Sequence, residues 1–455
     1  MSDPLDAVRA ALAGRDAWLV GGAVRDRLLG RATEDVDVAL EGDPRAAARA
    51  IARATGGASF RLSGAFGAWR VVGPGHAWHV DLVTLREDEI GADLSARDFT
   101  INAMAEPIAG GELLDPHGGR ADLEARRLRM VSAAALAEDP LRTLRAARLA
   151  TELSLAIEPA TRDAVAASAA GIARVAPERV FGELKRVLTA ERARDGLELM
   201  DALGLTPVVL PELTALRGVE QSEFHHADVH DHSLEVLDAV ARLERDPEWA
   251  PILAAPLADE LTRGGGMRFA ALLHDAAKPA TRGVRPDGRV TFIGHDSAGA
   301  DLARTVMRRL RASQRLTDYV AALTLHHLRL GFLVHERPLD RRSVWRYLRA
   351  TAPYSAEITI FTVADRLATR GRNADAAIAA HVELAREMIA RALEDRAAGP
   401  LAPLIRGDEL ARELGIPPGR RLGKLLTQLE EDRYAGEITT REDALRRARE
   451  LLESG

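Results

Sequence analysis

The alternation of apolar and polar residues divides the chain into a mixed N-terminal part and a longer helical part. Over the first 130 residues, short runs rich in β-branched residues alternate with Gly-rich turns and with helical stretches such as residues 45–54. The strand-like runs cover residues 17–20, 36–40, 70–72 and 79–84. This pattern predicts an N-terminal domain of the α/β or α+β class.

After residue 133 the strand signals almost vanish, and amphipathic helices follow one another with short Pro and Gly interruptions. Nine of the 13 histidines fall between His225 and His335, which sets this part of the helical region apart. A further boundary is predicted near residues 398–403, and the tail beyond it is interrupted at residues 415–419. We therefore expect four domains, at residues 1–130, 131–215, 216–398 and 399–455.

The composition excludes several classes of protein. The chain has 455 residues, 47% hydrophobic and 29% charged, so it can build buried cores. It has no cysteine, which excludes disulfides, zinc–thiolate sites and thiol nucleophiles and favours a reducing compartment. The N-terminus lacks a signal-peptide pattern, and no apolar run approaches the ~18 residues of a membrane span. We expect a cytoplasmic protein with no membrane partner.

The charge balance gives little information until individual positions are considered. The net charge is −6, which does not by itself indicate a polyanionic partner. Of the 62 basic residues, only Lys185, Lys278 and Lys424 are lysines. Arginine is the better residue for bidentate contacts with phosphates and bases, although coding bias also explains an arginine excess.

A Gly-Gly turn and an Asp pair lie close together near the N-terminus. Gly21 and Gly22 follow a strand-like run and precede a helix start, where backbone N–H groups can meet a phosphate, although a tight packing turn also explains such a pair. Asp35 and Asp37 alternate along the next strand and so share one face. Two carboxylates on an apolar strand favour a divalent cation, Mg²⁺ or Mn²⁺, and a solvent-facing pair at the strand end is the alternative.

This layout is that of a nucleotidyltransferase palm, and further segments extend the similarity. Residues 21–31, 35–37, 97–104 and 138–142 resemble, in order, the motifs of the bacterial-type (class II) tRNA nucleotidyltransferase and poly(A) polymerase family. The likeness covers residues 15–210, and the tail at 405–452 also resembles that family's C-terminal region. The resemblance implies a multidomain α+β protein with a polymerase-β-like palm containing a mixed sheet, an all-α neck, an HD domain and a helical tail. The neck and the tail would bind the acceptor and TΨC arms of tRNA by their shape and through phosphate contacts.

The resemblance also implies roles for residues of the palm. Asp35 and Asp37 would hold Mg²⁺ ions that activate the 3′-hydroxyl of an RNA and stabilise the α-phosphate and the departing pyrophosphate. The triphosphate and sugar would be positioned by Gly21, Gly22, Arg25 and Asp26. Asp81 is either a third palm carboxylate or a solvent-facing residue.

Other residues are implicated in recognition of the nucleotide. Arg97 and Asp98 would contact it and Asn102 would secure the local backbone, while Ala96 stands where family members often have a second basic residue. Asp139 and Arg142 are three apart, hence predicted on one helix face, and would act as a protein template for CTP or ATP; an ordinary ion pair is the alternative. The face is extended by Arg145 and Arg148. A last neck motif would support this helix, and it consists of Arg174, Glu178, Arg179, Glu183 and Lys185.

The histidine-rich part resembles the HD phosphohydrolase superfamily. His232, the pair His274-Asp275, and Asp365 occur in that family's order and would form a site for a divalent transition metal or Mg²⁺. His295 and His327 lie where two-metal versions add ligands, and Lys278 is a candidate phosphate contact. Satisfied core or surface histidines are the alternative, and four are interpreted as bystanders: His225, His226, His230 and His335.

These observations lead to an expected function. We expect template-independent addition of CMP and AMP, from CTP and ATP, to the 3′ end of tRNA, with an HD activity that removes 3′ phosphates or 2′,3′-cyclic phosphates. Within the same fold, a poly(A) polymerase or an enzyme restricted to CC or A addition remains open. An HD phosphohydrolase with a non-catalytic RNA-binding head is the alternative from another class.

Overall fold

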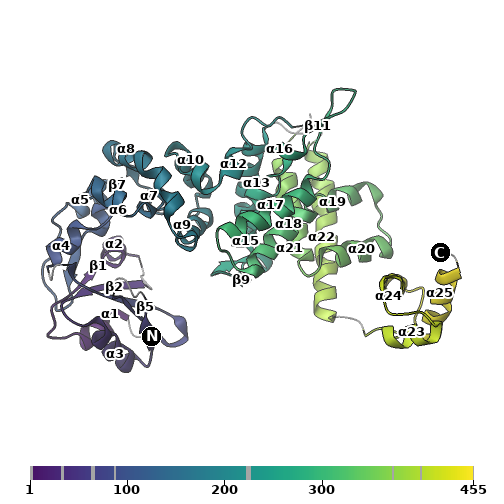
Figure 1. The fold of residues 1–455 in the computed structure, drawn as a ribbon, viewed down its shortest axis with the longest axis horizontal. Helices are drawn as coiled ribbons and strands as arrows, with labels where there is room; N and C mark the ends of the chain where they lie inside the picture. Colours follow the sequence, from purple (N-terminus) through teal and green to yellow (C-terminus); the bar gives the residue numbers. More distant parts are fainter. Residues whose placement is uncertain are drawn as a thin grey trace. The chain divides into compact units, whose positions relative to one another are not determined.

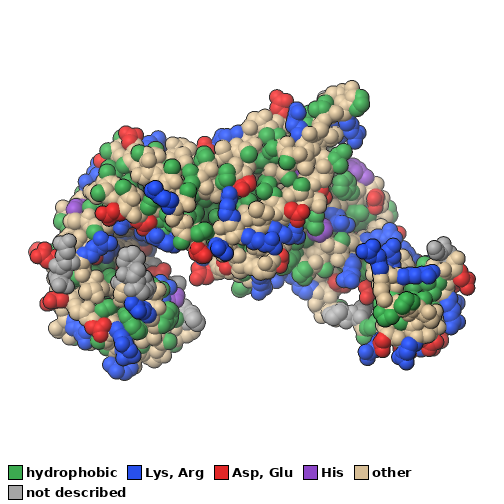
Figure 2. Space-filling model, in the orientation of Figure 1, with side chains coloured by type: hydrophobic (Ala, Val, Ile, Leu, Met, Phe, Trp, Pro, Cys, Tyr) green, Lys and Arg blue, Asp and Glu red, His purple; other side chains and the backbone are tan. Residues whose placement is uncertain are grey.

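The computed structural model describes residues 4–31, 35–62, 67–86, 89–221, 227–370, 374–399 and 402–453 (Figure 1). The chain forms two compact units, Met1–Val209 and Leu210–Gly455. Each unit is described by itself below. In Figure 2, basic and acidic side chains are interspersed on the visible face of each unit, in keeping with the small net charge.

A six-stranded mixed sheet forms the centre of the first unit, in the order β3-β4-β5-β2-β1-β6. The central strands β2 and β5 are parallel, and every other neighbouring pair in this sheet is antiparallel. The strands are β1 (Ala17–Val20), β2 (Asp35–Leu40), β3 (Ala58–Arg61), β4 (Trp69–Val72), β5 (His79–Thr84) and β6 (Ala105–Pro107). The sequence pattern predicted four of them and missed the two edge strands β3 and β6.

Alternation along the strands gives the sheet two different faces. Val36 and Val38 of β2 point into a core with Ile51 of α3 (Pro44–Thr55) and Val8 of α1 (Pro4–Ala11). The intervening residues of β2 lie on the opposite face, where Ala39 packs in a small apolar cluster with Val20 and Leu94. That face also carries Asp35 and Asp37, and α2 (Gly22–Leu28) begins beside it, directly after β1.

Helices complete the first unit. They are α4 (Ile90–Ser95), η3 (Thr100–Asn102), α5 (Gly119–Glu124), α6 (Ala133–Glu138), α7 (Leu141–Leu153), α8 (Pro159–Ser168), η4 (Ala169–Arg174), α9 (Pro177–Thr189), α10 (Ala193–Ala202) and α11 (Thr206–Val209), with short strands β7 (Arg127–Leu128) and β8 (Ala156–Ile157). Helix α7 packs against α9 and α10 through fully buried residues such as Leu144 and Ala147. The helical neck predicted after the head is confirmed, apart from the two-residue strand β8.

The second unit is built around four helices that pack on one another, α13 (Val229–Leu243), α15 (Arg263–Leu273), α18 (Gln314–His326) and α21 (Ser355–Ala368). Helix α15 can approach its neighbours closely because it contains Gly266, where a Cβ atom would lie 2.6 Å from the Leu257 side chain. Around these helices lie α12 (Pro211–Thr214), α14 (Ala250–Leu253), α16 (Lys278–Thr281), α17 (His295–Arg309), α19 (Arg329–Leu333), α20 (Arg341–Thr351) and α22 (Ala374–Ala398). Two short hairpins, β9 (Pro256–Ala258) with β10 (Leu261–Thr262) and β11 (Gly283–Val284) with β12 (Val290–Thr291), were not predicted.

The tail forms three helices with a small core of their own. Helices α23 (Gly407–Leu414), α24 (Arg420–Ala435) and α25 (Arg441–Glu453) bury Leu410, Leu429 and Ala444 between them. The predicted interruption at residues 415–419 is present, and a second one, around Gly436, was not foreseen.

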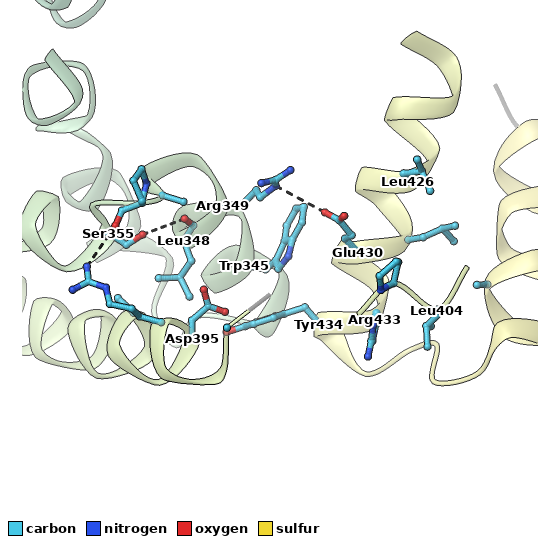
Figure 3. Close-up of a pocket in the computed structure, with 18 of the residues that line it drawn as sticks. Trp345, Leu348, Arg349, Ser355, Asp395, Leu404, Leu426, Glu430, Arg433 and Tyr434 are labelled. Carbon is cyan, nitrogen blue, oxygen red and sulfur yellow. Dashed lines mark hydrogen bonds and ion pairs between the residues drawn. The ribbon is translucent and has the colours of Figure 1, made fainter. Parts of the chain in front are cut away.

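Helix α24 is held to α20 by ion pairs, and a cavity opens beside this contact. Arg342 of α20 reaches the fully buried Asp432 of α24, with 2.6 Å between Nη2 and Oδ1. The cavity has a volume of about 600 Å³, and Trp345 and Tyr434 are among the residues that line it (Figure 3). None of the predicted metal ligands lies in its wall. Over the parts of the chain that the structure describes, no helix has the length and apolar character that crossing a membrane requires.

Candidate active sites

The first site lies where the β1–α2 turn meets strand β2. Gly21 has a φ of +68°, and a Cβ atom there would lie 2.8 Å from Nη1 of Arg97 and 3.2 Å from Oδ2 of Asp37. A side chain at position 21 would collide with the guanidinium and crowd the carboxylate, so only glycine fits at this turn. Helix α2 starts at Gly22, so its first N–H groups lie beside the same point.

The carboxylates of this site repel one another. Burial raises the pKa of Asp37 to about 6; Asp81 and Asp35 add to the rise and Arg97 opposes it. Asp35 is 81% exposed at its side chain and lies 3.4 Å from Nδ1 of His79. Several acidic groups lie on one sheet face, and the pKa of one of them, Asp37, is raised. A divalent cation would stabilise their ionised forms, so the arrangement fits a cation site.

Asp81 lies on the same face as Asp37. The two residues are directly opposite each other in the parallel pair of β2 and β5. Both carboxylate oxygens of Asp81 accept hydrogen bonds from Arg70 of β4, at 2.7 Å from Nε and 2.7 Å from Nη2. Asp81 is therefore a paired carboxylate beside the catalytic candidates.

Arg25, expected at the triphosphate, connects two elements in the structure. Its guanidinium is buried and donates to both oxygens of Asp26 and, at 2.7 Å, to Oδ1 of Asn102. Arg25 and Asp26 thereby tie helix α2 to η3. The sequence did not reveal this bridge.

Asp98 is the centre of a buried network. It accepts hydrogen bonds from the backbone N–H of Phe99, from Nδ2 of Asn102 and from Nη1 of Arg145. Burial alone would raise the pKa of Asp98, but the charge of Arg145 and these hydrogen bonds outweigh it, so the pKa is lowered. Nearby, Arg97 is held by Asp93 at 2.9 Å, which aims its Nη1 toward Gly21.

The predicted shared helix face of Asp139 and Arg142 is wrong. Helix α6 ends at Glu138, Asp139 is extended at φ −130° and ψ 92°, and α7 begins after Pro140. Proline cannot continue a helix from the preceding turn, so it separates the two residues. Oδ1 of Asp139 accepts from the backbone N–H of Leu141, and Oδ2 accepts from Arg179 at 2.7 Å.

Arg142, Arg145 and Arg148 follow one another on α7 but face different partners. Arg142 donates to the carbonyl of Ala135 at 3.2 Å, and burial lowers its pKa. Arg145 also pairs with Glu183 of α9. Arg148 is buried and bound by Glu183 and Glu152, which places it among the supports of α7 and away from an open nucleotide site. The last neck motif contributes Arg179 and Glu183 to these contacts, as a supporting role requires.

Sequence reasoning missed a buried anchor at Asp122. This carboxylate is fully buried and binds the hydroxyl of Thr100 at 2.7 Å, together with Arg127 and Arg129. A Cβ atom at Gly119 would lie 2.1 Å from the carbonyl oxygen of Thr100, so α5 packs directly on η3. The Gly118-Gly119 pair just before a helical segment was the available signal.

The second site brings together the predicted HD residues from α13, α15 and α21. Nε2 of His232 lies 3.0 Å from Oδ1 of Asp365, and Nε2 of His274 lies 3.9 Å from the same oxygen. Nε2 of His274 is also 3.2 Å from Oδ2 of Asp275. His232, His274 and Asp365 form one group whose candidate ligand atoms lie within 4.8 Å of one another.

A second group of three adjoins the first. Nε2 of His295 lies 3.3 Å from Oδ1 of Asp275 and 3.3 Å from Nε2 of His327. The Nδ1 atoms of His274, His295 and His327 are each bound to the backbone carbonyl three residues earlier, of Ala271, Phe292 and Thr324. This assigns the proton to Nδ1 and directs the Nε2 lone pairs toward the centre, as metal-binding histidines require.

The chemistry of this cluster fits one or two divalent cations. Among the described residues, Nε2 of His274 and Oδ1 of Asp275 are buried and make no hydrogen bond. Burial lowers the pKa of His327 to about 4, so its imidazole is neutral near pH 7. Burial acts against ionisation of Asp365, yet the hydrogen bond and charge of His232 lower its pKa. Neutral imidazoles and ionised carboxylates are the ligand forms of a mixed N/O metal site.

The remaining residues considered at this site have protein partners or lie apart. Lys278 is buried, with Nζ 2.7 Å from Oδ2 of Asp275, and it donates to Gln221. His230 pairs with Asp231, and His335 lies in η5 (Val334–Glu336). His225 and His226 lie outside the described residues.

Comparisons with known proteins match the domains in which the two candidate sites lie. Three family models match: the poly A polymerase head domain at residues 17–129, a probable RNA- and SrmB-binding site of polymerase A at 154–216, and an HD domain at 229–370. The A-adding tRNA nucleotidyltransferase of Deinococcus radiodurans is 39% identical over 94% of each chain. The chain belongs to the tRNA nucleotidyltransferase family. The CC-adding tRNA nucleotidyltransferase of Thermus thermophilus is 34% identical over 94% of this chain and 92% of its own.

Solved structures agree with this membership at the level of fold. The apo form I of a CCA-adding enzyme superposes with a TM-score of 0.61 at 20% identity, over 97% of this chain and 92% of that one. The tRNA nucleotidyltransferase family resemblance and the predicted order of a mixed-sheet head, helical neck and HD domain are thereby confirmed. The protein is an enzyme of nucleotidyl transfer, and its head and HD domains imply dependence on divalent metal ions.

Proposed function

We propose that the protein adds CMP and AMP to the 3′ end of tRNA without a nucleic-acid template. The observation that carries this proposal is the close approach of Asp37 and Arg97 to the Gly21 turn at the start of α2. A glycine turn at a helix N-terminus binds phosphate, and adjacent carboxylates bind the cation that phosphoryl transfer needs. The tRNA is inferred from the names of the relatives, which are A-adding, CC-adding and multifunctional CCA proteins.

The roles proposed for the head follow from its geometry. Asp35 and Asp37 would hold Mg²⁺, which lowers the pKa of the RNA 3′-hydroxyl and neutralises charge on the triphosphate. The N–H groups of Gly22 and the following turn would bind the triphosphate, with Arg97 beside them. Asp26 and Asn102 would fix Arg25 and so the start of α2.

Selection of the base is proposed for the junction of α6 and α7. Arg142 has five N–H donors, more than its bond to Ala135 requires, and Asp139 offers acceptor oxygens. Together they could hydrogen-bond the Watson–Crick edge of cytosine or adenine. With another base, at least one of these donors or acceptors would be left without a partner. Asp98, Arg145 and Arg148 would keep α7 in place from behind.

The HD cluster carries a second proposed activity, hydrolysis of 3′ phosphates or 2′,3′-cyclic phosphates on RNA. His232, His274, Asp275 and Asp365 would hold a transition metal or Mg²⁺, with His295 and His327 completing a two-metal site. Such ions supply a hydroxide for attack on phosphorus. A His274→Ala, Asp275→Ala double variant should lose hydrolysis of a cyclic phosphodiester, and hydrolysis that continues in it would refute this activity.

A restricted A-adding enzyme is a second candidate, because the Deinococcus relative named as A-adding is 39% identical over 94% of each chain. The test uses tRNA transcripts that end before C, after C, after CC and after CCA, with CTP and ATP given separately and together. Products that stop at CCA from every shorter primer establish full addition. Extension of the CC primer alone, by one A, establishes the restricted activity, and a long A tract would overturn both.

A further inference from the structure

A row of four residues crosses the active-site face of the sheet from the catalytic carboxylates to its free edge. Asp37 of β2 is opposite Asp81 of β5, Asp81 is opposite Arg70 of β4, and Arg70 is opposite Phe60 of β3. Directly opposed residues on neighbouring strands project to the same face. Phe60 therefore shares the face of Asp37, at the edge strand of the sheet.

The core does not need the outer members of this row. The neighbours Trp69 and Val71 turn to the other face, where Val71 is fully buried and Trp69 lies under Arg45 of α3. Phe60 is 47% exposed, and the side chain of Arg70 is 32% exposed. The guanidinium of Arg70 is fixed by its two hydrogen bonds to Asp81. An exposed aromatic ring next to an arginine is the combination with which proteins bind single-stranded nucleic acid.

The chemistry of the proposed reaction sets the side from which an RNA must arrive. The triphosphate site lies at the β1–α2 turn, and β1 borders β2 on the side away from β5. In phosphoryl transfer the attacking and leaving oxygens are roughly in line on opposite sides of phosphorus. With pyrophosphate leaving toward α2, the 3′-hydroxyl approaches over β5, and the strand behind it runs over β4 and β3.

We propose that Phe60 and Arg70 form a binding track for the 3′-terminal nucleotides of the RNA primer. Phe60 stacks on a base, and Arg70, positioned by Asp81, contacts the sugar–phosphate backbone. At ~4.8 Å per strand, Phe60 lies about 14 Å from Asp37, so it meets a nucleotide upstream of the terminal one. This inference rests on the proposed function, because it assigns the primer to a site where the metal and triphosphate are themselves proposed.

The kinetic test compares Phe60→Ala, Phe60→Tyr and a matched control. Loss of base stacking should raise the KM for the RNA primer about tenfold, with the KM for ATP or CTP unchanged, and Phe60→Tyr should restore it. The control is Leu114→Ala, because Leu114 is 37% exposed and pairs with Ala105 of β6 at the opposite edge of the sheet. It should leave the RNA KM unchanged.

The binding test does not depend on catalysis. RNA primers with 2-aminopurine at each of the last three positions should show fluorescence quenching at one position with wild type, and not with Phe60→Ala. An unchanged RNA KM and unchanged quenching in Phe60→Ala would overturn the track. If the wild-type protein binds the RNA and quenches its 2-aminopurine fluorescence but extends no primer, the proposed function is refuted and the track is still supported.

Discussion

Among single residues, Gly21 is the position of the first site where an added side chain has least space. Gly21 has a left-handed φ of +68°, and the side chains of Arg97 and Asp37 occupy the space that a Cβ atom would need. The sequence marked this glycine as a phosphate turn but could not show that its missing Cβ makes space for a carboxylate. Close approach of this kind depends on the packing of strands from distant segments, which a local pattern does not contain.

Gly21→Ala should reduce nucleotide incorporation about 100-fold, because a methyl group would displace Asp37 or Arg97 from their positions. Steady-state incorporation of labelled ATP or CTP measures the effect. Gly30→Ala is the matched control, since Gly30 has a φ of +66° with open space around its Cβ position. It should share the cost of the left-handed backbone but keep activity; equal losses in both variants would show that strain alone is responsible.

The pKa of Asp37 makes metal binding depend on pH. Because the pKa in the folded protein is raised from 3.8 to about 6, protons compete with Mg²⁺ well above the range of an ordinary aspartate. Affinity for Mg²⁺ should be constant above pH 7 and fall about tenfold per unit below pH 6. Calorimetric titration of Mg²⁺ into a His274→Ala, Asp275→Ala background isolates the head, and affinity that is flat down to pH 5 would contradict the assignment.

At the scale of elements, the sequence predicted strands and sites that repeat a simple pattern and missed those made by long-range contacts. Strands β1, β2, β4 and β5 have apolar residues on a buried face, whereas β3 is an exposed edge strand. The HD ligands could be predicted although 133 residues separate His232 from Asp365, because their types and order carry the signal. The partners of Arg145 and Arg148 could not be predicted. A spacing of three residues places two side chains on one helix but does not show which residues of the facing helix α9 they meet.

Glu183→Gln should destabilise the first unit by about 3 kcal/mol, because the buried carboxylate neutralises both Arg145 and Arg148 between α7 and α9. Urea denaturation monitored by circular dichroism measures the loss. The control Glu198→Gln removes an exposed pair with Arg194 on α10 and should cost less than about 1 kcal/mol. Similar costs for the two would mean that the Glu183 network is not a structural support.

At the scale of the whole molecule, the tail is attached to the rest of its unit through charged residues. Arg342 contacts Glu431, Asp432 and Glu437, and Asp432 is fully buried. The sequence predicts a tail beyond residues 398–403, but it does not predict this contact, because arginines are frequent throughout the chain.

Arg342→Ala should release the tail and weaken binding of tRNA several-fold, while the KM for ATP stays within twofold. Filter binding measures the affinity for tRNA, and limited proteolysis measures release of the tail. Arg349→Ala is the control, because Arg349 is 60% exposed and 3.9 Å from Glu430. Tail release without any change in tRNA affinity would refute the proposed role of the tail in binding.

We propose that the carboxylates beside the Gly21 turn hold the Mg²⁺ with which the protein adds nucleotides to the 3′ end of tRNA. One experiment tests this role: incorporation of labelled AMP into a tRNA ending in CC, measured for the wild-type protein and for Asp37→Asn. We expect that the wild type adds one A and that the variant, with its fold intact by circular dichroism, is at least about 1,000-fold slower, on the order of losses at catalytic carboxylates and their partners. Incorporation by Asp37→Asn at the wild-type rate would contradict it.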